Sequence, residues 1–243
     1  MLKGIAAAAS AMLPRIRAQE VIANNLANAS TAGFKRDRVF DVDLSGAQAV
    51  LAQTQPQWQT SQTSGISTDF SAGPLERTDN PLNVAVDGDG FFVVSTPDGE
   101  RYTRNGILQI ASDGTLVTVD GHPLQGWAGA VQVTGGTLTI ADDGMVSVDG
   151  LDVGQLRLVR FRDPSALVHA ASSLFAAADP MMPPEDDYES LVRQGYLEQS
   201  NVNTIEELVD MIATMRIYET DQKSIQIQDD TLGRAVSDLG RVR

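Results

Sequence analysis

The 243-residue sequence contains no cysteine, few aromatic residues and a deficit of positive charge. Without cysteine there is no disulfide scaffold, no thiolate nucleophile and no cysteine-based metal site. Lys and Arg number 18 against 32 Asp and Glu, and the net charge of −14 disfavours nucleic acid and anionic membrane surfaces as partners. No apolar run reaches the roughly 20 residues that a membrane-spanning helix needs. The ordinary apolar fraction of 42% still allows one or two folded domains.

The N-terminal segment has the spacing of a helix that packs on a partner helix. Apolar or small residues recur in alternating steps of three and four, as in a coiled-coil seam. This seam comprises Leu2, Ile5, Ala9, Met12, Ile16, Gln19, Ala23 and Leu26. Pro14 predicts a kink or a restart, and the helix should end near Asn28. Residues 3–13 superficially resemble a secretory signal, but the helical pattern continues past any plausible cleavage point.

The C-terminal segment predicts a second helix, capped by Asn203 or Thr204 with Glu206 or Glu207 as the capping-box partner. It should run to about Leu239. Its seam comprises Ile205, Leu208, Ile212, Met215, Tyr218, Gln222, Ile225, Asp229, Leu232, Val236 and Leu239, with a stammer at residues 212–218. The first forty residues are mainly basic and this helix is mainly acidic, which favours pairing of the two helices within one subunit or between neighbours. The alternative is two solvated helix faces with incidental charge.

Between the helices, short apolar runs alternate with Asp-Gly and Asn-Gly pairs from about Gly73 to Phe161. Such pairs favour the positive φ angles of tight hairpin turns. The predicted fold is therefore α+β, with terminal helices that pair in a coiled-coil-like layer around an inserted all-β domain of hairpins. The predicted domains are a helical assembly domain (1–38 and 200–243), an extended connector (39–72), a β-rich outer domain (73–178) and a return loop (179–199).

The sequence contains little that indicates catalysis or ligand binding. Its two histidines, His122 and His169, lie far apart, and residues 87–90 lack the ligand spacing of a calcium loop. We predict no catalytic, cofactor or metal site. Asn24 and Asn25 crowd the end of the first helix, where we expect their side chains to bond to neighbouring backbone groups. We also expect Asn25 and Asn201 to help lock one subunit to the next.

Four blocks of sequence resemble the flagellar basal-body rod and hook protein family. They are residues 24–35 (NNLANASTAGFK), 80–92 (NPLNVAVDGDGFF), 102–106 (YTRNG) and 194–203 (QGYLEQSNVN). They are long, ordered and spread over the whole chain. Within the family, the short length and residues 153–161 look most like the FlgF proteins, with the FlgG proteins as the near alternative. Pro14 and Asn83 depart from the family pattern.

The resemblance implies a structural subunit of the flagellar rod that polymerises helically through its terminal helices and transmits torque from motor to hook. It implies a periplasmic location, export through the flagellar export apparatus without a cleaved signal, and partners that are copies of itself and other rod proteins. No enzyme activity, cofactor, small-molecule substrate or nucleic acid is implied. The expected subunit interface comprises Ile5, Met12, Ile16, Asn24, Asn25, Leu26, Asn28, Thr31, Gly33, Phe34, Ser200, Asn201, Val202, Asn203, Leu208, Ile212, Met215, Tyr218, Ile225 and Leu232. A secreted β-domain adhesin or glycan-binding module with a coiled-coil stalk is the alternative, and a hydrolase is a weaker one.

Overall fold

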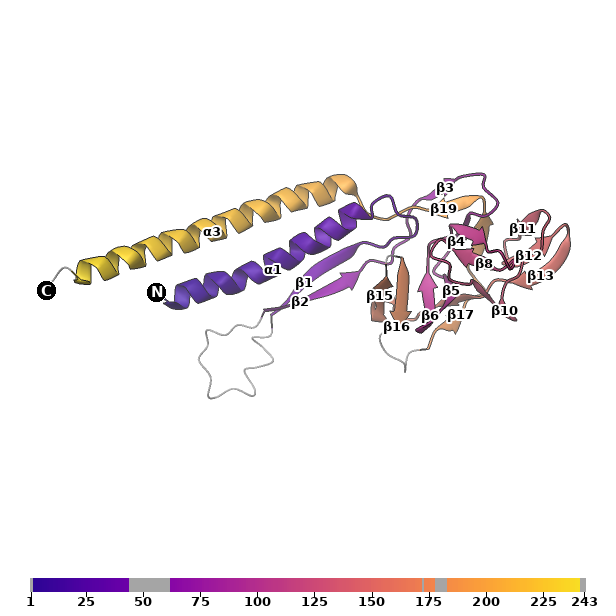
Figure 1. Ribbon diagram of the computed structural model, residues 1–243, viewed down its shortest axis with the longest axis horizontal. Helices are drawn as coiled ribbons and strands as arrows, with labels where there is room; N and C mark the ends of the chain where they lie inside the picture. The colour runs from indigo at the N-terminus through magenta and orange to yellow at the C-terminus, as the bar shows by residue number, and fades with distance from the viewer. Residues whose placement is uncertain (1, 44–61, 172, 178–182, 241–243) are drawn as a thin grey trace. The chain divides into compact units, whose positions relative to one another are not determined.

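The computed structural model describes residues 2–43, 62–171, 173–177 and 183–240 (Figure 1). The chain divides into two compact units. Unit 1 takes residues 1–27, 37–67 and 203–243, and unit 2 takes residues 28–36 and 68–202. The described residues form two long helices in unit 1 and mostly strands elsewhere, which confirms the α+β class.

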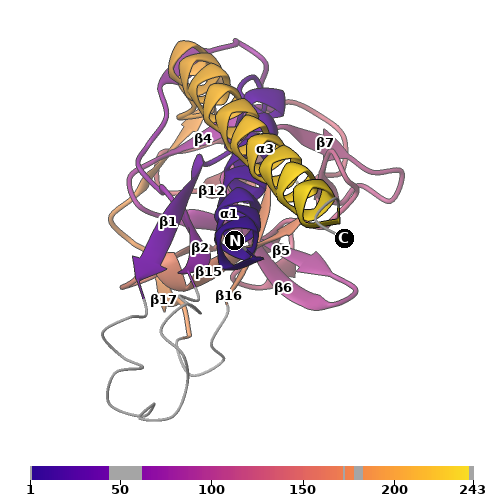
Figure 2. The same ribbon diagram turned by 90° about the vertical axis from the view of Figure 1, so that its left-hand side faces the viewer.

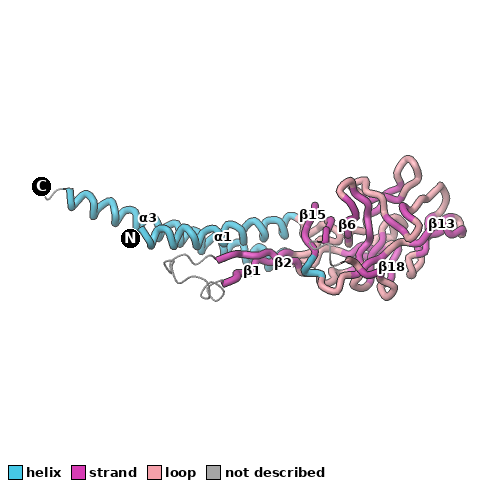
Figure 3. Tube along the Cα trace, turned by 90° about the horizontal axis from the view of Figure 1, so that it is seen from below, coloured by secondary structure: helices cyan, strands magenta, loops and turns pink. Residues whose placement is uncertain are grey.

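Unit 1 contains helices α1 (Leu2–Ala27) and α3 (Thr204–Gly240), which lie side by side and run in opposite directions (Figures 1 and 2). Strands β1 (Asp37–Asp43) and β2 (Gln62–Thr68) pair in a two-stranded sheet, and β1 packs against α1 (Figure 3). The predicted extended connector therefore contains two paired strands. Residues 44–61 of that connector lie outside the described residues.

Both helices end close to the predicted positions. The helix α1 is continuous from Leu2 to Ala27, so Pro14 does not restart it. Loss of one helical hydrogen bond at Pro14 costs about 3 kcal/mol, which packing along α3 can offset. At the start of α3, Asn203 Oδ1 accepts hydrogen bonds from the N–H groups of Ile205 (3.1 Å) and Glu206 (3.5 Å), which confirms Asn203 as the cap.

The face of α3 that is covered in unit 1 differs from the predicted seam. Its covered positions follow alternating steps of four and three with no stammer: Glu207, Met211, Thr214, Tyr218, Asp221, Ile225 and Gln228. Of the expected α3 interface residues whose side chains are described, Tyr218 and Ile225 lie there, whereas Leu208, Ile212 and Met215 are exposed. Among the α1 side chains that the structure describes, the most buried are those of Val21 and Asn25, neither of which belongs to the predicted seam. An apolar pattern marks a face that can pack, but it does not identify the neighbour that covers it.

Unit 2 is built of short strands around one six-stranded sheet of order β15-β16-β6-β5-β14-β17. The strands are β3 (Leu75–Arg77), β4 (Val84–Asp87), β5 (Phe91–Thr96), β6 (Gly99–Thr103), β7 (Leu108–Ile110), β8 (Leu116–Thr118), β9 (Gln125–Gly126), β10 (Gly129–Ala130), β11 (Leu138–Ile140), β12 (Met145–Val148), β13 (Leu151–Gln155), β14 (Leu158–Arg160), β15 (Leu167–Ala171), β16 (Leu174–Ala177), β17 (Glu185–Asp186), β18 (Leu191–Gln194) and β19 (Tyr196–Glu198). A short 3-10 helix, η1 (Pro164–Ala166), precedes β15.

Strand β5 lies at the centre of the core of unit 2. Its side chains alternate between the two faces of the sheet, so Phe92 and Val94 join the larger apolar cluster. Phe91 and Val93 join the smaller cluster on the other face. The continuous apolar run of β5 therefore reflects a strand that is buried on both sides.

Two of the Asp-Gly turns have the same geometry. In the turns at residues 111–115 and 141–145, the alanine N–H donates to a carbonyl four residues later, and the aspartate Oδ1 accepts from the N–H two residues later at 3.0 Å. Gly114 and Gly144 have φ angles of +84° and +79°, which glycine adopts without strain. Here the local sequence signal and the observed turn agree.

The predicted return loop, residues 179–199, contains three strands. Strand β17 pairs with β14, β18 with β4, and β19 with β3. The partner of β18 lies about 100 residues earlier in the chain, so no local turn signal announces the pairing. Long-range pairing was the feature that sequence reasoning missed in this segment.

Candidate subunit interface

A stripe of apolar side chains lies exposed on α3. We call it the α3 stripe, and it comprises Ile205, Leu208, Val209, Ile212 and Met215. The exposed fractions range from 43% for Leu208 to 74% for Ile205. These positions recur at helical spacing and avoid the face that α1 covers. Contiguous exposed apolar surface of this kind is typical of protein–protein contacts.

The side chain of Asn25 forms hydrogen bonds inside unit 1. Its Oδ1 accepts from the Asp37 N–H at 2.9 Å, and its Nδ2 donates to the Asp37 carbonyl at 2.8 Å and to Glu207 Oε2 at 3.3 Å. Asn25 and Glu207 are each 1% exposed. The Asn25 side chain thus connects α1 with the start of β1 and with the first turn of α3 in the same subunit. Its two bonds to the Asp37 backbone are of the kind expected from the sequence. These three hydrogen bonds are made within one subunit, and the expected role of Asn25 between subunits stays a prediction.

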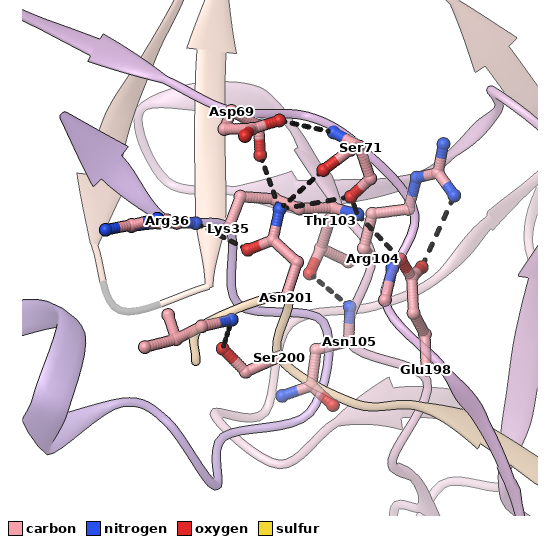
Figure 4. A network of polar contacts seen from close by, with 12 residues as sticks. Lys35, Arg36, Asp69, Ser71, Thr103, Arg104, Asn105, Glu198, Ser200 and Asn201 are labelled. Atoms are coloured by element: carbon pink, nitrogen blue, oxygen red, sulfur yellow. Dashed lines mark hydrogen bonds and ion pairs between the residues drawn. The ribbon is translucent and has the colours of Figure 1, made fainter. Parts of the chain in front are cut away.

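Three buried charges lie together in unit 2 (Figure 4). Lys35 Nζ lies 2.6 Å from Glu198 Oε1, and Arg104 NH1 lies 3.3 Å from Glu198 Oε2. Lys35 also donates to the Ser71 carbonyl at 2.7 Å, and the Gly73 N–H donates to Glu198 Oε1 at 2.9 Å. The Arg104 guanidinium lies 4.7 Å from the ring centroid of Phe91. The side chains of Lys35, Arg104 and Glu198 are at most 2% exposed.

The pKa values of the two cations reflect this burial. Desolvation lowers the pKa of Lys35, against the opposing attraction of Glu198. Burial likewise lowers the pKa of Arg104, again opposed by Glu198. Glu198 is therefore the carboxylate whose attraction most strongly opposes the desolvation of both cations.

Asn201 joins three segments of unit 2 (Figure 4). Its Oδ1 accepts from the Arg36 N–H at 2.7 Å, and its Nδ2 donates to the carbonyls of Asp69 (2.8 Å) and Ser71 (3.1 Å). Ser200 Oγ accepts from the Val202 N–H at 3.2 Å. Residues 28–36, 68–74 and 197–202 are therefore linked to one another where the chain enters and leaves unit 2.

The other expected interface residues lie in several settings. Gly33, Phe34 and Ser200 are buried in unit 2, where Gly33 N–H donates to the Glu198 carbonyl. Asn28 and Thr31 form a turn by hydrogen bonds at 3.0 and 3.2 Å. Asn24 and Ile16 are exposed, and Met12, Leu26 and Val202 are half-buried. Nothing is described for the side chains of Ile5 and Leu232.

Sequence reasoning missed the group formed by Lys35, Arg104 and Glu198, and separately it missed Glu207 as the partner of Asn25. Each stood in or near a recognised block, but no spacing rule pairs residues that lie 163 positions apart. Among the described residues, no group of three or more potential ligand side chains could hold a metal ion. Neither helix of the described part is long and apolar enough to cross a membrane.

Comparison with known proteins accounts for the four sequence blocks. Family models match residues 5–35 (flagella basal body rod protein), residues 85–148 (flagellar hook protein FlgE/F/G D1 domain) and residues 193–238 (flagellar basal body rod FlgEFG protein C-terminal). The flagellar basal-body rod protein FlgG of Buchnera aphidicola subsp. Schizaphis graminum is 38% identical over 235 residues, spanning 87% of this chain and 90% of the relative. The chain belongs to the flagellar basal-body rod protein family.

Relatives named FlgF are similar to the same degree. The FlgF protein of Escherichia coli is 36% identical over 235 residues, spanning 89% of this chain and 90% of the relative. The FlgF protein of Caulobacter vibrioides is 33% identical over 232 residues, spanning 93% of each. The predicted likeness to the FlgF and FlgG rod proteins is confirmed. This rod protein is accordingly a structural subunit of the flagellar basal body, and the relatives lend no support to the adhesin alternative.

Proposed function

We propose that this rod protein polymerises helically through its terminal helices and so builds part of the shaft that transmits torque from motor to hook. The observation that supports this mechanism is the α3 stripe. The five apolar side chains of the α3 stripe are exposed on a helix whose other face is already covered by α1. Burial of such side chains yields about 25 cal/mol for each Å² removed from water, which favours a protein partner over solvent.

The charges of the two helices favour a neighbouring copy as that partner. Exposed Arg15 and Arg17 lie on α1, while Glu206, Asp210 and Glu219 are exposed on α3. Helices of opposite charge attract each other and set the orientation in which they pack. We therefore expect Leu208, Ile212 and Met215 of α3 and Ile16 of α1 to lie in the interface between copies. We also propose that the terminal helices pair as in a coiled coil.

The proposed route to this site is export through the flagellar export apparatus without a cleaved signal, followed by assembly in the periplasm with copies of itself and other rod proteins. Residues 3–13, which superficially resemble a signal, are part of α1 and continue without interruption to Ala27. Their removal would take away part of the helix that packs on α3. We propose no catalytic role, cofactor or small-molecule substrate for this chain.

The test is a charge placed in the α3 stripe. We expect Ile212→Asp to abolish filament or rod formation, because assembly would bury an unpaired carboxylate. The variant monomer should melt like the wild type, because Ile212 is 53% exposed in the single chain. Negative-stain electron microscopy, sedimentation of concentrated protein and a motility assay of complemented cells measure the loss.

Ala213→Asp is the matched control, because Ala213 is exposed one position further along α3 and points about 100° away from Ile212. It introduces the same charge into the same helix and should assemble normally. Normal assembly and motility of Ile212→Asp would refute the proposed interface. Equal loss in both variants would indicate a general effect of charge on α3 instead.

A further inference from the structure

Of the carboxylates in the described part of unit 2, Glu198 alone contacts both buried cations, Lys35 and Arg104. It lies 2.6 Å from Lys35 Nζ and 3.3 Å from Arg104 NH1, and it also accepts the Gly73 N–H. Asp69, Asp89 and Asp187 act on these cations only as more distant charges. Without Glu198, two like charges would stay buried with no contacting anion, a far larger penalty than the loss of one neutral hydrogen bond.

The three charges come from distant parts of the chain. Lys35 belongs to residues 28–36, which we call the leading segment, and Glu198 belongs to residues 197–202, which we call the closing segment. Arg104 follows β6, in the middle of unit 2. The leading segment is thus the first stretch of unit 2 along the chain, and the closing segment ends its last stretch. Glu198 contacts both the leading segment and the middle of the unit.

Backbone bonds tie the same segments together. The Gly33 N–H of the leading segment donates to the Glu198 carbonyl at 2.8 Å, and the Gln199 N–H of the closing segment donates to the Pro74 carbonyl at 2.9 Å. The Arg36 N–H donates to Asn201. Strand β19, which carries Glu198, also pairs with β3. Removal of either segment would therefore leave several buried polar groups without hydrogen-bond partners at once.

We propose that Glu198 couples the folding of unit 2 to the docking of both its leading and its closing segments. In a chain that lacks the closing segment, Lys35 and Arg104 would have to enter an apolar core as uncompensated cations, so unit 2 stays unfolded. Only a complete chain then presents a folded β unit to an assembly. The coupling is a property of the monomer and does not depend on how copies pack.

Native-state hydrogen exchange of the full-length monomer tests this coupling. If unit 2 folds as one piece, the Gly33 amide should exchange through the same opening as the amides of β5. In Glu198→Gln both sets should exchange faster together, by about a hundredfold or more, because two buried cations lose their anion. In Lys35→Met the acceleration should be at least about tenfold smaller, because Glu198 still neutralises Arg104.

Glu189→Gln is the matched control, because Glu189 forms an ion pair with Arg160 on the surface of unit 2, where its side chain is 82% exposed. It should leave all exchange rates unchanged. If Glu198→Gln does not fold while Lys35→Met does, the proposal is supported. The proposal is overturned if the Gly33 amide accelerates while β5 keeps wild-type protection, or if Lys35→Met is as damaging as Glu198→Gln.

Discussion

Gly33 offers a direct measure of how tightly the leading segment packs on unit 2. Gly33 is buried and has a φ angle of +70°. A Cβ atom added there would lie well inside 3.0 Å of the Arg104 carbonyl carbon and the Asn105 amide nitrogen. Since both obstacles are backbone atoms, rotation of a side chain cannot relieve the overlap. Gly33→Ala should therefore displace the leading segment or the strand connection at residue 104.

The cost has two parts. A left-handed backbone conformation costs an L-residue about 1–2 kcal/mol. Overpacking of a tight contact adds about 1–3 kcal/mol, because carbon atoms prefer separations of about 3.5–4.0 Å. We therefore expect Gly33→Ala to lower the free energy of unfolding of unit 2 by about 2–5 kcal/mol.

Gly121→Ala separates the two parts. Gly121 has a φ angle of +81°, yet a Cβ atom there would meet nothing within 4 Å. This control should cost only the conformational part, about 1–2 kcal/mol. The difference between the two variants then measures the steric clash against the backbone of Arg104.

Urea unfolding followed by tryptophan fluorescence measures both variants. The chain has two tryptophans, so a Trp58→Phe background leaves Trp127 of unit 2 as the reporter. With an m-value of about 2 kcal/mol/M, the midpoint should fall by about 1–2.5 M for Gly33→Ala and by about 0.5–1 M for Gly121→Ala. Equal midpoints for the two variants would refute the tight packing of the leading segment on Arg104.

Three further predictions test other parts of the subunit. Asn25→Ala should destabilise unit 1 by about 2–4 kcal/mol, because it removes three hydrogen bonds of roughly 0.5–1.5 kcal/mol each. The control Asn24→Ala changes an exposed side chain and should lower the melting temperature, followed by circular dichroism at 222 nm, much less. Equal melting temperatures would contradict the role of Asn25 in holding unit 1 together. Desolvation raises the pKa of Asp187, but hydrogen bonds from Ser190 and from the Glu189 and Ser190 N–H groups outweigh it and lower the pKa below its ordinary 3.8. Its contribution to stability should be complete above 3.8 and lost as pH falls through the lower folded pKa, so Asp187→Asn should flatten acid unfolding. Phe92→Ala should cost about 3–5 kcal/mol of unit 2 stability, and Ile110→Ala, 45% exposed, much less; similar urea midpoints would contradict the core assignment.

Several features followed from the sequence because their signals are local. Apolar periodicity predicted two terminal helices, and Asn203 marked the start of the second because its side chain can accept from the N–H groups of the first turn. Asp-Gly pairs predicted turns such as that at Gly114, since glycine adopts the required positive φ angle. The four family blocks were recognisable in the same way, as short runs of residues in fixed order.

Other features required the tertiary structure because they join residues far apart in the chain. The sequence showed that Ile212 lies on an apolar face of α3, but the structure alone showed that α1 covers a different face, centred on positions such as Tyr218. It also showed that Asn25 bonds to Asp37 and Glu207 inside unit 1, which no spacing in the sequence indicates.

The sequence by itself thus determined the class of fold, the positions of the helices and the family, since each depends on residues close together in the chain. The tertiary structure decided that the leading segment belongs to the β unit and that Lys35 meets Glu198. A buried ion pair between residues 163 positions apart leaves no periodicity, turn or cap in the sequence. Lys35 and Glu198 can be identified as partners only in the folded protein, where both side chains are removed from water and their opposite charges are in contact.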